Sequence, residues 1–238
     1  MTPLLLVGSL GTTTAMWDPV RDAFAERFDV HAFDLPGHGG APIRQGPLTI
    51  EQIARGVLEH APERFAYCGL SIGGMVGLWL GANAPDRVER AVVACTGAKL
   101  HGGSDYEARA ELVRREGTGV VVAGARERWF TAAFRHSAEA QRILEDLAHV
   151  PAEGYASCCE AVAAWDFRAE LPHVAVPTLA LFGAEDPVTP PDVRETLADG
   201  VPGLRSEELA HAAHLAAVEQ PEAFAASALA HLDRRSDP

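Results

Sequence analysis

The sequence predicts an α/β protein built on a doubly wound, mostly parallel sheet. Three observations carry this prediction: short apolar runs of strand length recur along the chain, they lack polar alternation, and helical patterns separate them. Strands without polar alternation are typical of a parallel sheet that helices cover on both faces. Regular alternation of strand and helix is the pattern of doubly wound folds.

Six runs are expected to form the strands, the last of them the weakest, and they occupy residues 4–7, 29–34, 64–68, 90–95, 178–182 and 204–209. The intervening helices are expected at residues 16–27, 49–60, 72–83, 190–199 and 220–232. Pro19, Pro191 and Pro221 fall near the starts of three of these helices, where the missing amide proton of proline is harmless.

The alternation of strand and helix breaks between Thr96 and Pro177. This interval carries helical patterns and no strand run, with glycine and proline residues between the helical stretches. We predict a helical cap over residues 99–168 and an α/β core formed by residues 1–98 and 169–238. An insertion after the carboxyl end of a strand lies where open α/β sheets bind their ligands.

Charge and cysteine content exclude several classes of function. The chain holds 20 Lys and Arg against 33 Asp and Glu, which argues against a nucleic-acid-binding surface but leaves room for an anionic small molecule. Its four cysteines show neither a disulfide framework nor metal-ligand spacing. The apolar opening segment lacks a basic leading region and is too short for a signal peptide or membrane span. We expect a cytoplasmic protein without metal, cofactor, membrane or nucleic-acid partner; its oligomeric state is left open.

A pentapeptide at residues 69–73, Gly-Leu-Ser-Ile-Gly, matches the G-x-S-x-G nucleophile elbow and stands between a predicted strand and a predicted helix. A nucleophile on such a turn adopts unfavourable backbone angles, and bulky residues two positions away would collide with neighbouring elements. The flanking glycines let Ser71 project its hydroxyl above the sheet. The amide of Ile72, at the helix start, would donate to an oxyanion. The alternative is a plain turn.

A catalytic serine also needs a base and a group that orients the base, which follow in this topology in the order serine, acid, histidine. Asp186 lies in the loop after the strand at 178–182 and is the predicted acid, with a turn-capping role and the neighbouring Glu185 as alternatives. His214 and His211 both follow the last strand. We choose His214, because a base that reaches the serine should come from the loop and not from the strand tip.

The second oxyanion donor should come from the loop after the first strand. This loop covers residues 8–12, and the amide of Leu10 is the candidate, with Gly8 and Gly11 permitting close approach. The glycine-rich turn that begins at Asp34 ends the next strand. We assign Asp34 a structural role in this turn.

These motifs together resemble the α/β-hydrolase superfamily over practically the whole chain: DLPGHG, GLSIGG, GAEDPVTP and AHLAAVEQPEAF. A narrower resemblance, carried by GSLGTTTAMWDPV, by the WLGANAP run at residues 79–85 and by ERWFTAAF, is to the 3-oxoadipate enol-lactone hydrolases of aromatic catabolism, the β-ketoadipate pathway. In that family the oxyanion loop reads S-L-G-T, which residues 9–12 reproduce. The resemblance implies an α/β-hydrolase fold with a helical cap.

Three features depart from that family's pattern. Members usually have two further strands before the oxyanion loop, and this chain starts directly at the third. Gly8 stands where an asparagine is usual, and the turn at residues 35–40 is less basic than the family's version. Each departure leaves room for another ester or lactone substrate.

The resemblance implies hydrolysis of a five-membered enol-lactone to an open keto diacid through a covalent acyl-enzyme. The substrate's carboxylate needs a cationic partner, for which Arg128 with Trp129 in the cap is the candidate; alternatively, Trp129 anchors the cap's core and Arg128 is a solvated surface residue. Two other functions remain open: a carboxylesterase, thioesterase or other lactonase of a biosynthetic pathway, and a non-catalytic scaffold of the same fold.

Overall fold

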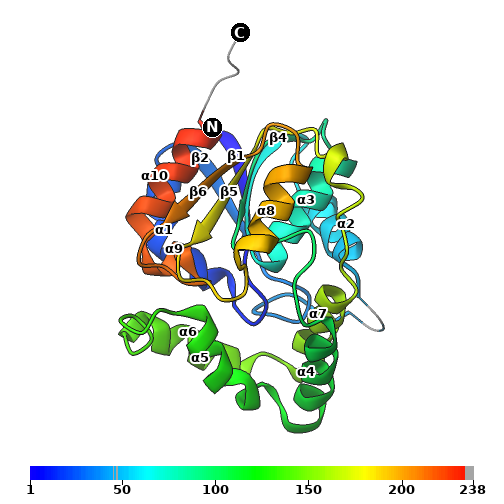
Figure 1. The fold of residues 1–238 in the computed structure, drawn as a ribbon, viewed down its shortest axis with the longest axis vertical. Helices are drawn as coiled ribbons and strands as arrows, with labels where there is room; N and C mark the ends of the chain where they lie inside the picture. Colours follow the sequence, from blue (N-terminus) through cyan, green and yellow to red (C-terminus); the bar gives the residue numbers. More distant parts are fainter. Residues whose placement is uncertain (45, 47, 234–238) are drawn as a thin grey trace.

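The computed structural model describes residues 1–44, 46 and 48–233 (Figure 1). Its centre is a six-stranded sheet in the order β2-β1-β3-β4-β5-β6, in which every neighbouring pair is parallel. The strands are β1 (Thr2–Val7), β2 (Phe28–Phe33), β3 (Phe65–Leu70), β4 (Val88–Ala94), β5 (Thr178–Gly183) and β6 (Arg205–Leu209). All six coincide with the predicted strands to within a few residues, which confirms the predicted doubly wound parallel sheet.

Helices cover both faces of this sheet (Figure 1). One face carries α1 (Asp18–Ala25), α9 (Ala216–Glu219) and α10 (Pro221–Leu232), and the other carries α2 (Ile50–His60), α3 (Ile72–Asn83) and α8 (Pro191–Gly200). Short 3-10 turns occur at η1 (Thr14–Trp17), η2 (Thr118–Val121) and η3 (Leu171–His173). Proline occupies an early position of α1, α8 and α10, as predicted. The sequence patterns did not predict the single turn of α9.

Four further helices lie between β4 and β5 in the chain: α4 (Gly103–Glu116), α5 (Val122–Trp129), α6 (Ala138–His149) and α7 (Ala152–Ala163). They form a separate layer beyond the carboxyl ends of the strands (Figure 1). Ser137 caps the start of α6, where its side chain accepts a hydrogen bond from the amide of Ala140. We refer to this helical layer as the cap. The exact division into core and cap at residues 98 and 168 stays a prediction.

The order of the strands places a topological switch point between β1 and β3. From β1 the chain moves outward to β2, and from β3 it proceeds in the opposite direction through β4, β5 and β6. Val7 and Gly69 are register partners at the ends of β1 and β3, so the loops that follow them leave the sheet side by side. Ligands of open α/β sheets bind at such a point.

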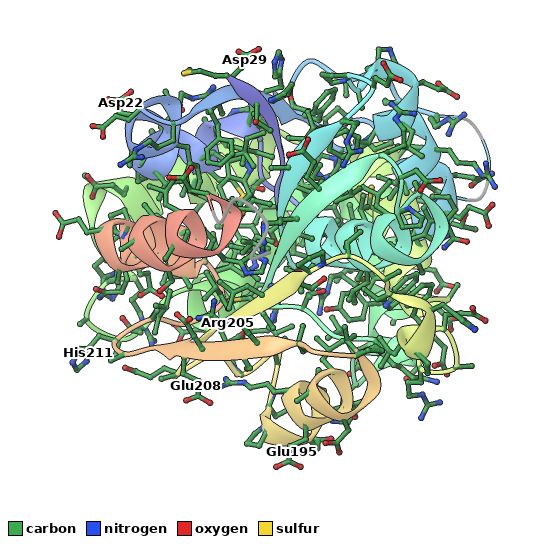
Figure 2. The ribbon with its side chains drawn as sticks, turned by 90° about the horizontal axis from the view of Figure 1, so that it is seen from above. Asp22, Asp29, Glu195, Arg205, Glu208 and His211 are labelled. Atoms are coloured by element: carbon green, nitrogen blue, oxygen red, sulfur yellow. The ribbon has the colours of Figure 1, made fainter. Side chains whose placement is uncertain are left out.

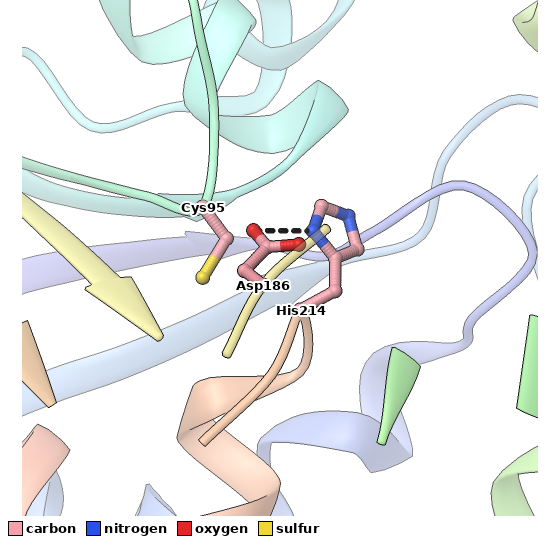
Figure 3. A group of neighbouring side chains, drawn as sticks. All are labelled: Cys95, Asp186 and His214. Carbon is pink, nitrogen blue, oxygen red and sulfur yellow. Dashed lines mark hydrogen bonds and ion pairs between the residues drawn. The ribbon is translucent and has the colours of Figure 1, made fainter. Parts of the chain in front are cut away.

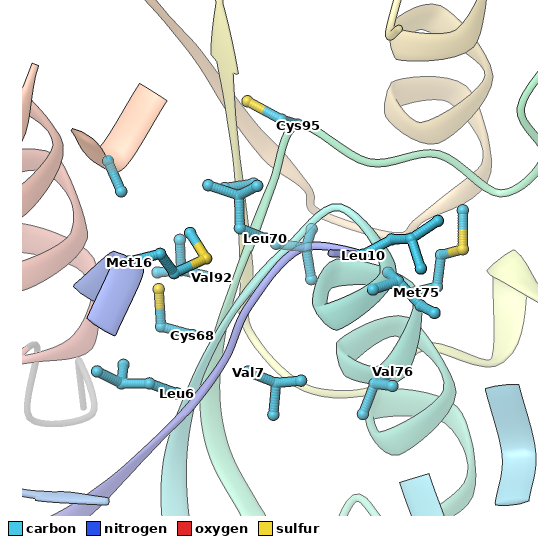
Figure 4. Packing of buried hydrophobic residues seen from close by; sticks show 14 of the residues in the cluster. Leu6, Val7, Leu10, Met16, Cys68, Leu70, Met75, Val76, Val92 and Cys95 are labelled. Atoms are coloured by element: carbon cyan, nitrogen blue, oxygen red, sulfur yellow. The ribbon is translucent and has the colours of Figure 1, made fainter. Parts of the chain in front are cut away.

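Burial is nearly complete around β3 and α3. Every residue of β3 is buried, and α3 is apolar on nearly all sides because the sheet, α2 and η3 surround it. Figure 4 shows Leu6 beside Cys68 on one face of the sheet, while Val7 points toward Val76 of α3 on the other, as strand alternation requires. No helix in the described ranges has the length and apolar character that a membrane span needs.

Candidate active site

Ser71 stands between β3 and α3 with φ 58° and ψ −117°, a conformation that side chains rarely adopt. A Cβ atom at Gly69 would lie 2.2 Å from the Gly73 carbonyl oxygen, and one at Gly73 would lie 2.0 Å from the Val7 carbonyl oxygen. Either contact is with backbone that cannot yield. The glycines therefore serve close packing around the turn, and the strain is concentrated at the serine itself.

Hydrogen bonds on both sides hold this turn. The Ser71 amide donates to the Ala94 carbonyl at 2.8 Å, and the Thr96 hydroxyl donates to the Ser71 carbonyl at 2.8 Å. The Gly73 amide donates to the Gly8 carbonyl at 3.2 Å, which ties the elbow to the loop after β1. Two segments that are distant in sequence, the end of β4 and the loop after β1, thus fix the position of the serine.

The amides of Leu10 and Ile72 are available to a ligand. Within the described part of the chain, neither amide donates a hydrogen bond to another protein group. Both residues are buried next to Ser71, and Leu10 lines the same pocket as the serine. This arrangement agrees with the predicted oxyanion hole, whose role in catalysis stays a prediction. Close packing also restricts position 8 to glycine, because a Cβ atom there would lie 2.6 Å from the Met16 sulfur.

His38 fixes the loop that carries Leu10. Its Nε2 accepts a hydrogen bond from the Gly11 amide at 3.0 Å, so the proton resides on Nδ1, which donates to the Pro36 carbonyl at 3.1 Å. Burial lowers the pKa of His38 to about 4, although the Pro36 carbonyl and the charge of Asp34 act in the opposite direction. The imidazole is therefore neutral at pH 7. The sequence patterns gave this histidine no role.

Asp34 has the structural role assigned to it. Its carboxylate accepts hydrogen bonds from the Thr14 amide at 2.7 Å and the Gly40 amide at 3.0 Å. A Cβ atom at Gly39, where φ is +50°, would lie 2.2 Å from an Asp34 oxygen. The glycine-rich turn closes around this carboxylate.

We expect acid to destabilise the protein through His38. The unfolded imidazole has a pKa near 6.5, so between pH 6.5 and about 4 the unfolded state binds a proton that the folded state does not, and stability falls as the pH falls. This loss amounts to about 2 kcal/mol between pH 7 and 4.5. Urea unfolding at both pH values, in the wild type and in His38→Gln, measures it. Gln can accept the Gly11 hydrogen bond but cannot be protonated, so an equal pH dependence in both proteins would contradict the assignment.

Asp186 and His214 form a buried pair. Asp186 Oδ2 and His214 Nδ1 lie 3.0 Å apart, and the two side chains are 0% and 3% exposed (Figure 3). The carboxylate also accepts hydrogen bonds from the Thr189 hydroxyl at 2.5 Å and the Val188 amide at 2.8 Å. Burial alone would raise the pKa of Asp186, but the facing His214 and these donors outweigh it and hold that pKa below its usual value. The carboxylate can therefore orient the imidazole.

The competing residues point elsewhere. His211 is exposed and lies at the rim of the molecule, with its side chain directed away from the protein (Figure 2). Its backbone has φ 57°, and its carbonyl accepts a hydrogen bond from the Gln220 side chain at 3.0 Å. Glu185 is exposed as well. Both choices made from the sequence, Asp186 over Glu185 and His214 over His211, agree with this placement.

Cys95 is a third polar group beside this pair. Ligand atoms of Cys95, Asp186 and His214 lie within 4.8 Å of one another (Figure 3). Burial, and after it the charge of Asp186, raises the pKa of the Cys95 thiol far above its usual value, so the sulfur stays protonated. His214 Nδ1 is already hydrogen-bonded to Asp186. These properties make the cluster a poor metal site.

One pocket brings together the candidate residues of core and cap. Ser9, Leu10, Ser71 and His214 line it from the core, and the cap contributes Tyr106, Arg109, Arg128, Trp129, Tyr155 and Val162. The free space that these side chains leave between them is small, about 20 Å³. A larger pocket lies between β2 and α2, but no serine, threonine or cysteine lines it among the described residues. The smaller pocket is therefore the candidate active site.

Two arginines of the cap, Arg109 and Arg128, line this pocket. Arg109 lies 4.6 Å from the ring centre of Tyr106, an arrangement that holds the cation in place. Burial, and after it the neighbouring charge of Arg109, lowers the pKa of Arg128. Two cations that repel each other beside a serine and a histidine would be stabilised by an anion between them. Arg128 and Trp129 were predicted, whereas Arg109, Tyr106 and Tyr155 were missed.

The sequence held only a weak signal for Arg109. Tyr106 and Arg109 are three residues apart and share a face of α4. The same helix also carries Arg114 and Arg115, and in the sequence these two arginines look like Arg109. Arg114 pairs with two glutamates of α7. Nothing in the sequence distinguishes Arg114 from Arg109, which lines the pocket.

Comparison with known proteins agrees with this geometry. The family model of the alpha/beta hydrolase fold matches residues 2–221. The chain belongs to the α/β-hydrolase family. Among curated relatives of this hydrolase, 3-oxoadipate enol-lactonase 2 of Acinetobacter baylyi is 37% identical over 234 residues, covering 93% of this chain and 85% of that protein. The pimeloyl-[acyl-carrier protein] methyl ester esterase of Neisseria meningitidis serogroup C is 31% identical over 233 residues, covering 93% of this chain and 90% of that protein.

Solved structures include a similar molecule. The crystal structure of the enol-lactonase from Burkholderia xenovorans LB400 superposes on this hydrolase with a TM-score of 0.94 at 34% identity. The match covers 98% of this chain and 92% of that chain. The similarity therefore extends over the core and the helical cap together.

Proposed function

We propose that this α/β hydrolase opens a small anionic enol-lactone of the 3-oxoadipate type, as in the β-ketoadipate pathway, through an acyl-enzyme on Ser71. The observation that carries the proposal is the single pocket in which Ser71 and His214 face two cap arginines, Arg109 and Arg128. The names of the Acinetobacter and Burkholderia relatives support the substrate class. A serine beside a base opens the lactone, and a cationic wall selects a carboxylate-bearing substrate.

In the proposed reaction, His214 Nε2 takes the proton of the Ser71 hydroxyl as the serine oxygen attacks the lactone carbonyl. Asp186 holds the proton of Nδ1 and so keeps the imidazole in the required tautomer. The amides of Leu10 and Ile72 donate to the oxyanion, each contributing about 3 kcal/mol in comparable sites. Collapse of this intermediate breaks the ring carbon–oxygen bond, and His214 returns the proton to the departing enol oxygen.

The leaving group of a lactone stays tethered to the acyl group. The enol tautomerises to a ketone, and water, activated by His214, then attacks the acyl-enzyme and releases a keto dicarboxylate. The carboxylate that the substrate already carries is proposed to bind Arg109 and Arg128. Release adds a second negative charge next to Ser71.

The alternative is an esterase for a larger acyl group, which the Neisseria relative supports by its name. The two arginines that line the pocket favour an anionic lactone over the neutral methyl ester of a long carrier-bound chain. Steady-state turnover of a panel distinguishes the two: the enol-lactone, its methyl ester, a neutral lactone of equal ring size, and short and long methyl esters. The proposal predicts the highest kcat/KM for the free-acid enol-lactone; turnover of the methyl esters without turnover of any lactone would contradict it.

We predict that Arg109→Gln and Arg128→Gln each raise KM for the anionic enol-lactone by about 10- to 100-fold, because a charge-assisted hydrogen bond contributes about 1.5–3 kcal/mol. KM for the uncharged methyl ester of the same lactone should change little. Arg126→Gln is the matched control, since Arg126 lies on α5 with Arg128 and bonds instead to the Arg135 carbonyl. Equal losses for the charged and uncharged substrates would contradict a role in carboxylate binding.

A further inference from the structure

A buried carboxylate, that of Glu219, connects the catalytic histidine loop with the cap. Glu219 is the last residue of α9 and is 6% exposed. Its Oε2 accepts a hydrogen bond from the Ala213 amide at 2.6 Å. Its Oε1 accepts two, from the Thr131 amide at 2.9 Å and from the Thr131 hydroxyl at 2.8 Å. The two oxygens thus bind two segments that are far apart in sequence.

Both segments border residues of the active site. Ala213 directly precedes His214, and Thr131 follows Trp129 and Phe130 at the end of α5. A second bond joins the same segments, because the Leu215 amide donates to the Trp129 carbonyl at 3.0 Å. The histidine loop and the cap segment that carries Arg128 are therefore bonded at two points next to the pocket.

The bonding pattern favours the ionised form of Glu219. Each of its oxygens accepts from a backbone N–H, and a carboxylate, unlike a carboxylic acid, accepts at both oxygens without a proton that needs an acceptor of its own. Burial raises the pKa of this carboxyl even so, and among the described residues no cation pairs with it. A buried charge held only by neutral donors is costly, which calls for a reason at this position.

We propose that Glu219 is a positioning residue that holds the His214 loop and the Arg128–Trp129 segment in one fixed arrangement, so that the base and the carboxylate-binding wall act on the same bound substrate. The inference rests on the proposed function for the identity of the substrate. Its two halves are separable: Oε2 sets the histidine loop and hence kcat, whereas Oε1 sets the cap segment and hence KM for an anionic substrate.

Two variants test the two halves. Thr131→Val removes only the hydroxyl donor to Oε1, and we expect a three- to tenfold rise in KM for the anionic enol-lactone with kcat unchanged for an uncharged chromogenic ester. Glu219→Gln places an amide NH2 against a backbone N–H on one side, and we expect kcat to fall at least tenfold on both substrates. Thr131→Ser keeps the hydroxyl and is the matched control, expected to behave as the wild type.

Thermal unfolding of each variant separates positioning from stability. If Thr131→Val and Glu219→Gln lower the melting temperature but leave kcat and KM unchanged at temperatures where they are folded, Glu219 is merely structural and the inference is wrong. The chromogenic ester keeps this test independent of the proposed substrate. Loss of kcat on the ester in Glu219→Gln supports the histidine half even if the enol-lactone is not turned over by any form of the protein.

Discussion

Ser71→Ala is expected to abolish hydrolysis, lowering kcat by about 10⁴-fold or more, because the other groups cannot supply the missing nucleophile. The fold should stay intact, since the bonds that hold the elbow come from the Ser71 backbone and Thr96 and not from the Ser71 hydroxyl. Steady-state rates with a chromogenic ester and with the enol-lactone measure the loss. Circular dichroism and thermal unfolding monitor the fold.

The matched control for this substitution is Ser227→Ala, because Ser227 lies on α10, outside the pocket. It should retain the wild-type rate. Undiminished turnover in Ser71→Ala would show that the reaction proceeds without the elbow, and the proposed mechanism would then be wrong.

His214→Ala should cost about 10⁴- to 10⁶-fold in kcat, whereas His211→Ala should change it by less than about twofold. The reason is the difference in placement: His214 is buried, bonded to Asp186 and lines the pocket with Ser71, while His211 is exposed at the rim. The two substitutions are the same chemical change three residues apart, so each controls for the other. A large loss in His211→Ala with little in His214→Ala would reverse the assignment.

Much of this site followed from local sequence, because local rules govern its parts. A strand, a glycine-flanked serine and a helix require the same strained turn in any setting, and the φ of 58° at Ser71 meets that requirement. The choice of His214 over His211 depended only on distance from a strand end. Patterns of apolar residues likewise placed the strands, since a parallel sheet between helices buries each strand on both faces.

The missed residues depend on contacts between distant segments. Arg109 and Glu219 look like ordinary charged helix residues, and only the packing of the cap onto the core brings one into the pocket and the other between two loops. His38 was passed over for the same reason, because its partner Gly11 lies 27 residues away. Hydrophobic periodicity reports which face of an element is buried, but it carries no information on which polar group another element will meet.

The cap gives the pocket its proposed preference for a small anion. Its helices supply both arginines that line the pocket among the described residues, while the core supplies the proposed nucleophile and base. The proposal thus places reaction chemistry and substrate choice on different parts of the chain, joined at Glu219 and at the bond between Leu215 and Trp129. Substitutions in the cap should alter which substrate binds before they alter the chemical step.

Stoichiometric labelling with a fluorophosphonate tests the central claim most directly. The reagent should modify one residue per chain, Ser71, as located by peptide mass spectrometry, and enol-lactone turnover should fall in proportion to the labelled fraction and reach zero at full labelling. Excess substrate should slow the labelling. Enol-lactone turnover that persists in fully labelled protein, or a label on any residue other than Ser71, would contradict the account.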